Sequence, residues 1–138
     1  MLTFTEDKKW FNQFKEIIMS NSVKGIFKNK KMNIIINTRF SAVHLWPDCD
    51  LEEVYYLRFP HRHEFHVKVK APVSHENRDI EFILLKNKIE RWISENWDKK
   101  NLKQKSCETM CNDLMFNFPE LTYVSVLEDG ENGSEVIK

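Results

Sequence analysis

The sequence predicts an α+β domain in which an antiparallel sheet is covered on one face by two helices. Residues 32–40 and 61–70 are rich in β-branched or alternating apolar residues, as strands are. Apolar residues recur at helical spacing in residues 80–97 and again after Ser106. Two short strand-like runs then close the chain around the Asp-Gly pair at 129–130. The predicted order of elements is therefore β-β-α-α-β-β.

The composition indicates one globular domain and excludes several classes of partner. The chain has 138 residues, 41% of them hydrophobic, and its 21 basic side chains balance 21 acidic ones. A balanced charge gives no overall attraction to nucleic acid or to an anionic membrane surface, so we expect neither as a partner. Only three glycines are present, which nearly excludes a glycine-rich phosphate loop.

The cysteines favour a reducing compartment. Cys49, Cys107 and Cys111 are odd in number, and the N-terminal sequence mixes acidic and basic residues in a way that a signal peptide does not. No apolar run is long enough for a membrane span. We therefore expect a cytoplasmic protein with free thiols, in which Cys107 and Cys111 serve packing.

Residues 1–30 are predicted to form a helical extension outside the main domain. After a capping threonine, apolar residues recur at helical spacing from Trp10 to Ile18. The polar stretch Lys28–Lys31 then separates this helix from the rest of the chain. The main domain is predicted over residues 31–138.

The first two strands are expected to pair as a long antiparallel hairpin. The first strand is the sequence MNIIINTRF at 32–40, and the second, at 61–70, alternates apolar and polar residues from Phe65 to Val69. A long polar loop that contains proline, residues 46–60, joins the two strands.

Two helices are expected to cover one face of the sheet. The predicted inward stripe of the first helix is Phe82, Leu85, Ile89, Trp92 and Ile93. The second helix begins after the N-cap candidate Ser106, and its predicted inward residues are Met110, Leu114 and Met115. Residues 121–129 and 134–138 supply the two closing strands.

Histidines cluster at the start of the second strand. His61 and His63 are two residues apart, so their side chains leave the same face of the strand, whereas His66 points to the other face. His44, at the end of the first strand, is the natural third ligand because hairpin pairing brings it beside them. Three imidazoles with one open position are typical of a catalytic zinc site. The spacing alone also suits solvated or core histidines, and His66 and His75 are assigned to that class.

Six short segments, taken in order, resemble one family. The sequence FSAVH, followed by HRHEFHVKV, is similar to the F-x-A-x-H and H-G-H motifs of the 6-pyruvoyltetrahydropterin and 6-carboxytetrahydropterin synthases, whose fold is the T-fold. The similarity continues in order through DIEFILLK, WDKKNLK, SCETMCNDLMF and VSVLEDG. It covers residues 31–138, whereas the N-terminal helix has no counterpart in the pattern.

This resemblance implies a site and an assembly. It implies that His44, His61 and His63 hold zinc and that Glu128 anchors a bicyclic heterocycle, since a carboxylate accepts two parallel N–H bonds from a pterin or guanine. Glu108, in the motif that opens the second helix, is a further candidate for ligand binding. The family also implies a homo-oligomer, a trimer or hexamer, with the pocket between subunits.

The residues for proton transfer depart from the family pattern. The general base of the family is a cysteine four residues before the first histidine of H-G-H, and that position is Leu57. The supporting Asp-His pair becomes Asp98 and Lys99, and the glycine of H-G-H becomes Arg62. Proton transfer by the usual groups is therefore lost, while the metal and heterocycle residues are retained.

Two functions follow from this combination. The first is a zinc lyase or epimerase acting on a substrate like dihydroneopterin triphosphate, with a substitute base such as Cys49 or Lys99 beside Asp98. The acidic and tyrosine residues of 52–56 are other candidates for that base. The second is a T-fold protein that binds a pterin, guanine-type or nucleotide ligand without turnover.

Overall fold

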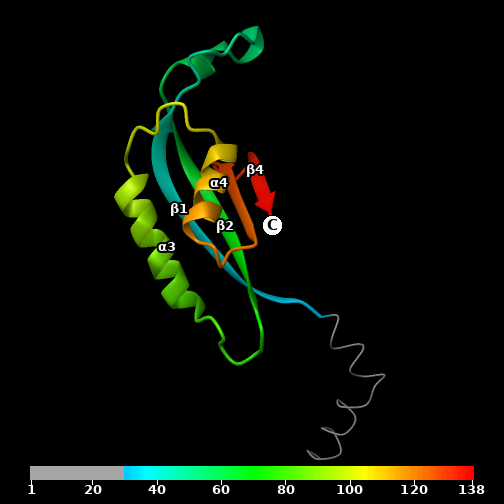
Figure 1. Ribbon diagram of the computed structural model, residues 1–138. Coiled ribbons are helices and arrows are strands. Elements are labelled where there is room, and N and C mark those ends of the chain that lie inside the picture. Colours follow the sequence, from blue (N-terminus) through cyan, green and yellow to red (C-terminus); the bar gives the residue numbers. More distant parts are fainter. Residues whose placement is uncertain (1–29) are drawn as a thin grey trace, which may run out of the picture. The chain divides into compact units, whose positions relative to one another are not determined.

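The computed structural model describes residues 30–138, so the predicted N-terminal helix lies outside the described residues. The elements are β1 (Met32–His44), η1 (Glu52–Arg58), β2 (His61–Val73), α3 (Phe82–Asn96), α4 (Cys107–Asn117), β3 (Tyr123–Glu128) and β4 (Asn132–Ile137). The four strands form one antiparallel sheet in the order β1-β2-β3-β4 (Figure 1). The predicted α+β class with an antiparallel sheet is confirmed.

The hairpin of β1 and β2 is longer than predicted at both strands' C-terminal ends. Each strand has 13 residues, and the register runs from Met32 opposite Val73 to His44 opposite His61. Residues 41–44 and 71–73 carry no strong strand signal of their own. They adopt strand structure because residues 41–44 pair with β2 and residues 71–73 pair with β1. The sequence did not predict the short 3-10 helix η1. It lies in the loop between His44 and His61, which extends beyond that end of the hairpin (Figure 1).

One core lies between the sheet and the two helices. From the sheet it takes the even-numbered residues of β1 and β3 and the odd-numbered residues of β2, as strand alternation requires. The fully buried side chains that face one another there include Phe65, Val67, Val124, Ile89 and Leu114. Helix α3 contacts β1, and α4 contacts β3 and β4, so both helices pack on the same face of the sheet.

The helical stripes are confirmed except at the start of α3. Leu85, Ile89 and Ile93 are buried, and Trp92 packs against the core, but Phe82 is 53% exposed and lies outside the core cluster. The prediction for Phe82 was wrong. Its position in the sequence fits the helical spacing of the stripe, but within residues 30–138 its side chain does not pack against the core.

The second helix follows its prediction closely. Met110 and Leu114 are fully buried, and Met115 is partly buried against the core. Ser106 is the N-cap, since its side chain accepts a hydrogen bond from the backbone N–H of Thr109. Neither α3 nor α4, the two α-helices of the described residues, has the length and apolar character that crossing a membrane requires.

The turn between β3 and β4 is built from Asp129 and Gly130. Both residues have positive φ, +55° and +74°, and the N–H of Glu131 donates to the carbonyl of Glu128 at 2.9 Å. This is the backbone of a type I′ turn, for which Asp-Gly is a preferred pair. In β4, a Cβ at Gly133 would meet the carbonyl oxygen of Val126 at 1.9 Å, so only glycine fits there.

Candidate metal centre

Three histidines gather at the end of the β1–β2 hairpin. The register sets His44 opposite His61, and His63 lies two residues further along the same face. The ring centroids are 4.6 Å apart for His44 and His61, 5.0 Å for His61 and His63, and 5.3 Å for His44 and His63. One nitrogen from each ring lies within 4.8 Å of the others, which is close enough for the three side chains to hold one metal ion.

Each of the three rings is oriented by an oxygen at its Nδ1 atom. His44 Nδ1 bonds the carbonyl of Lys105 at 2.9 Å, and His61 Nδ1 bonds the carbonyl of Phe59 at 2.8 Å. His63 Nδ1 bonds Oδ2 of Asp129 at 2.7 Å. These oxygens only accept, so in a neutral ring the proton sits on Nδ1 and the lone pair is left on Nε2. Such outer partners are what metal-binding histidines normally have.

Burial leaves two of the Nε2 atoms without a partner. The Nε2 atoms of His44 and His63 are buried, and neither makes a hydrogen bond to any group of residues 30–138. An unpaired buried polar atom costs about 1–3 kcal/mol, so its presence calls for a reason. A metal ion would supply the missing partner of both nitrogens, and the donor set therefore fits one.

His44 is held in the form that binds metal. Its side chain is buried, and burial lowers the pKa of His44 below its ordinary value of 6.5. The hydrogen bond to the Lys105 carbonyl opposes this shift, as does the nearby charge of Glu128, but burial is the larger effect on the pKa. The neutral imidazole, which carries a lone pair, is thus favoured.

Asp129 belongs to the site and was not predicted. Its Oδ2 accepts from His63, and its Oδ1 accepts from the backbone N–H of Glu64 at 3.0 Å. These two hydrogen bonds, that from His63 first, lower the pKa of the Asp129 carboxyl. The sequence marked Asp129 only as a turn residue, and its second role depends on the register that places β3 beside β2.

Glu128 lies directly at the histidine cluster. It pairs with Phe65 across the sheet, so its side chain shares the face of His63 and His44. Its Oε1 is 3.2 Å from His44 Nε2, and its Oε2 is 3.3 Å from His63 Nε2. The Sγ of Cys107 also contacts Oε1, at 3.9 Å.

A pocket of about 540 Å³ opens onto these groups. Two of the histidines, His44 and His61, lie in its wall together with the carboxylates of Glu108 and Glu128. The apolar part of the wall is Leu45, Trp46 and Leu57. The remaining lining residues are Gln104, Lys105, Ser106, Cys107, Asn132, Gly133 and Ser134. A small-molecule site combines apolar surface with convergent polar groups, and this pocket offers both, with polar residues in the majority.

The predicted base Cys49 lies elsewhere. Its side chain is 1% exposed, and its Sγ donates weakly to the carbonyls of Leu51 and Val54, inside the loop that carries η1. Among the described residues, the pocket wall holds Leu57 but not Cys49. The thiol therefore stabilises the loop, and within this chain it does not reach the histidines' pocket.

The predicted pair Asp98 and Lys99 is also apart from the pocket. Asp98 Oδ1 accepts from the backbone N–H of Ser41 at 3.1 Å, and the N–H of Lys99 donates to the Ser41 carbonyl at 2.6 Å. Residues 99–103 continue along the outer edge of β1, where the N–H of Val43 donates to the carbonyl of Lys100 and the N–H of Leu102 donates to the carbonyl of Val43. Asp98 and Lys99 therefore lie at the outer edge of β1. Neither residue is in the pocket wall formed by residues 30–138.

The three cysteines are free and buried. Burial raises the pKa of Cys107 to about 12, with the charge of Glu128 as the next cause. Burial likewise raises the pKa of Cys111 to about 11. Both thiols are therefore packing groups of α4, as the sequence predicted, and neither is a thiolate at neutral pH.

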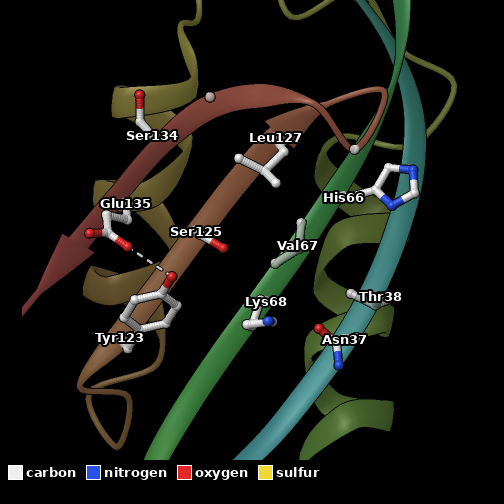
Figure 2. A pocket seen from close by; sticks show the side chains of 12 residues that line it. Asn37, Thr38, His66, Val67, Lys68, Tyr123, Ser125, Leu127, Ser134 and Glu135 are labelled. Carbon is white, nitrogen blue, oxygen red and sulfur yellow. Dashed lines mark hydrogen bonds between the residues drawn. The ribbon is translucent and has the colours of Figure 1, made fainter.

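The open face of the sheet carries a second hollow of about 450 Å³ (Figure 2). His66 lies here, on the face opposite to His63, as strand alternation predicted, and its Nε2 is 2.9 Å from Glu64. Figure 2 also shows Tyr123 donating to Glu135, at 2.9 Å. His75, the other histidine outside the cluster, lies in a loop 3.6 Å from Asp79.

No protein-family model matches this chain, and no curated protein matches it significantly.

Proposed function

We propose that this chain is a zinc-binding T-fold protein of the 6-pyruvoyltetrahydropterin or 6-carboxytetrahydropterin synthase type, whose pocket takes a pterin-like ligand. The observation that carries the proposal is the histidine cluster, in which each Nδ1 is bonded to an oxygen and two buried Nε2 atoms lack partners. The order of the six sequence segments supports the family assignment.

His44, His61 and His63 would hold the zinc ion through their Nε2 atoms, because their Nδ1 atoms are already bonded. When bound, the ion supplies a Lewis acid that polarises a hydroxyl or carbonyl of the ligand's side chain. The residues of this chain orient the three imidazoles, and burial favours the neutral form of His44. Asp129 holds His63 in place, and the carbonyls of Lys105 and Phe59 hold the other two rings.

The pocket wall supports a flat ligand rich in N–H donors. Glu108 and Glu128 offer two carboxylates, each able to accept a pair of N–H bonds from an amino group and the adjacent ring nitrogen. Trp46 and Leu57 offer apolar surface on which a bicyclic ring can lie. The family assigns the anchoring role to Glu128.

The position of the proton-transfer residues favours binding without turnover. Leu57 lines the pocket at the sequence position of the family's base, and its side chain carries no proton to transfer. Cys49 is buried in the η1 loop. The second candidate function, a zinc-dependent lyase or epimerase, needs a substitute base, either from the acidic and tyrosine residues of 52–56 or from Asp98 and Lys99 at the pocket of another copy of the chain.

A homo-oligomer, trimer or hexamer, is part of the same proposal. The sheet is open, with β1 and β4 at its edges, and unpaired edges favour strand pairing between copies. Among residues 30–138, the segment 99–103 covers the outer edge of β1 only from Ser41 to Leu45, and no other described segment pairs with Met32–Phe40 on that side. Size-exclusion chromatography with light scattering tests this, and a monomer would contradict it.

One assay separates the two candidate functions. Zinc-loaded protein is incubated with dihydroneopterin triphosphate under reducing, anaerobic conditions, and loss of substrate and release of triphosphate are followed by mass spectrometry. We expect stoichiometric zinc and saturable pterin binding without turnover. Turnover that disappears in His61→Ala would instead establish the lyase. A chain that binds neither zinc nor a pterin would contradict both.

A further inference from the structure

The carboxylate of Glu128 lies close to the Nε2 atoms of His44 and His63 without forming a hydrogen bond to either. Its two carboxylate oxygens approach the Nε2 atoms of His44 and His63 to 3.2 and 3.3 Å. Neither nitrogen makes a hydrogen bond to that carboxylate, or to any other group of residues 30–138, despite these short separations. The direction of approach is therefore wrong for an N–H donor on either ring.

The proton positions make this contact unfavourable by itself. Because each Nδ1 is bonded to an oxygen that only accepts, a neutral ring has a lone pair on Nε2. Two such electron-rich nitrogens then lie 3.2 and 3.3 Å from the negative oxygens of Glu128 inside a partly buried site, with no proton between them. Electron pairs in that arrangement repel one another, and a cation shared by all three groups would turn the repulsion into attraction.

The separations match those between ligands of one ion. Ligand atoms about 2.0–2.1 Å from a tetrahedral zinc ion lie about 3.3–3.4 Å from one another. Each oxygen of Glu128 lies near that distance from one histidine nitrogen, Oε1 at 3.2 Å from His44 and Oε2 at 3.3 Å from His63, so the carboxylate is within reach of an ion that both nitrogens bind. Lone pairs that converge on a common ion do not point along the lines that join the ligands, which accounts for the missing hydrogen bonds.

We propose that Glu128 is a fourth protein ligand of the metal ion, which makes the centre a three-histidine, one-carboxylate site when no other ligand is present. This inference rests on the metal site of the proposed function and changes the role that the family resemblance gives to Glu128. A carboxylate added to three imidazoles suits zinc and also widens the site to harder ions such as Mn²⁺ and Fe²⁺.

If Glu128 binds the metal, the two carboxylates of the pocket have different roles. Glu108 lies in the first turn of α4 and lines the same pocket. With Glu128 on the metal, Glu108 is the carboxylate left to accept N–H bonds from a heterocycle. A heterocycle that uses Glu128 instead must draw it from the ion, so heterocycle and metal would weaken each other's binding.

Metal affinity in matched variants tests the proposal. The full chain is freed of metal with a chelator, and Zn²⁺ affinity is measured by competition with a chromophoric chelator for the wild type, Glu128→Gln and Glu108→Gln. Both variants remove one negative charge from the same pocket, and circular dichroism checks that both are folded. We expect Glu128→Gln to weaken Zn²⁺ binding by about 10- to 100-fold and Glu108→Gln to change it by less than about twofold.

Cobalt gives a second readout that does not depend on affinity. The visible absorption of bound Co²⁺ reports its ligands, so we expect the Co²⁺ spectrum to change in Glu128→Gln and to stay as in the wild type in Glu108→Gln. Unchanged Zn²⁺ affinity and an unchanged Co²⁺ spectrum in Glu128→Gln would overturn this inference and leave the three-histidine site standing. Equal losses in both variants would also overturn it, since pocket charge alone would explain them. A wild-type chain that binds neither ion would overturn the inference and the proposed metal site together.

Discussion

His63 and Asp129 lie 66 residues apart in the sequence and are joined by a hydrogen bond of 2.7 Å between Nδ1 and Oδ2. The bond exists because β3 pairs with β2 and ends opposite Phe65, so that the turn after β3 falls beside His63. Asp129 needs a positive φ for this turn, which aspartate tolerates better than most residues. One residue thus shapes the hairpin and orients a histidine.

Asp129→Asn should weaken metal binding while leaving the fold intact. Asparagine tolerates the same positive φ, so the turn is kept, but the amide lacks the negative charge that makes the His63 ring a better ligand. We expect the Kd for Zn²⁺ to rise about 10-fold, measured by chelator competition.

Asp79→Asn is the matched control for that variant. Asp79 also accepts two hydrogen bonds with its carboxylate, from the backbone and hydroxyl of Ser74, in a loop outside the histidine cluster. We expect its Zn²⁺ affinity to equal that of the wild type. If Asp129→Asn also bound zinc as the wild type does, the outer bond to His63 would have no role at the site.

His44→Ala should lose the metal. His44 is the most buried of the three histidines in the cluster, and its removal leaves only two imidazoles facing the site. We expect the zinc content to fall from about one ion per chain to near zero by elemental analysis after dialysis. His66→Ala is the control, because His66 lies on the opposite face of the sheet, and it should keep its zinc. Full zinc content in His44→Ala would remove this residue from the ligand set.

Removing the metal should destabilise the protein. An ion that binds only the folded chain stabilises it by about 2.7 kcal/mol when free ion is at about 100 times its Kd. For a domain of this size that raises Tm on the order of 10 °C. Thermal unfolding with zinc and with excess chelator measures the difference, and His44→Ala should show none. An equal Tm with and without zinc in the wild type would contradict a bound ion.

The sequence predicted those parts of the fold that depend on residues close together in the chain. Alternation in β2, the stripe of α3 and the cap at Ser106 each depend on neighbours within a few residues, and each was predicted from them. The 3-10 helix η1 was missed because its sequence has no apolar period, and none of its residues is buried. Phe82 was misassigned because spacing does not reveal where a packing partner ends.

The site was predictable only in part for a similar reason. The pair His61 and His63 is visible as a two-residue spacing on one strand, and His44 follows from hairpin pairing. The positions of Asp129 and of the Glu128 carboxylate depend on how β3 sits beside β2, which sequence spacing does not contain. Cys49 is a candidate base by sequence because it lies in the loop that precedes His61, and in the structure that loop buries its thiol.

The metal-free protein should lose stability as the solution becomes acidic. Burial lowers the pKa of His44 in the folded chain below the ordinary value of 6.5, so the unfolded chain takes up this proton first as pH falls. The free energy of unfolding is therefore full above pH 6.5 and decreases as pH falls through the folded pKa of His44. Urea unfolding of chelator-treated protein on both sides of that pH measures the loss. The loss should shrink in His44→Gln, and an equal loss in that variant would assign the effect to other groups.

The three thiols should be almost unreactive in the folded protein. Burial raises the pKa of Cys107 to about 12 and that of Cys111 to about 11, so at a pH of about 8 only about one molecule in 10⁴ and one in 10³ carry the thiolate. Cys49 is 1% exposed and is shielded by its own loop. We expect a thiol reagent to label none of the three in minutes under native conditions and all three in denaturant. Leu57→Cys places a thiol in the pocket wall, where it should be the first to react. Rapid labelling of the wild type would contradict the burial of its three thiols.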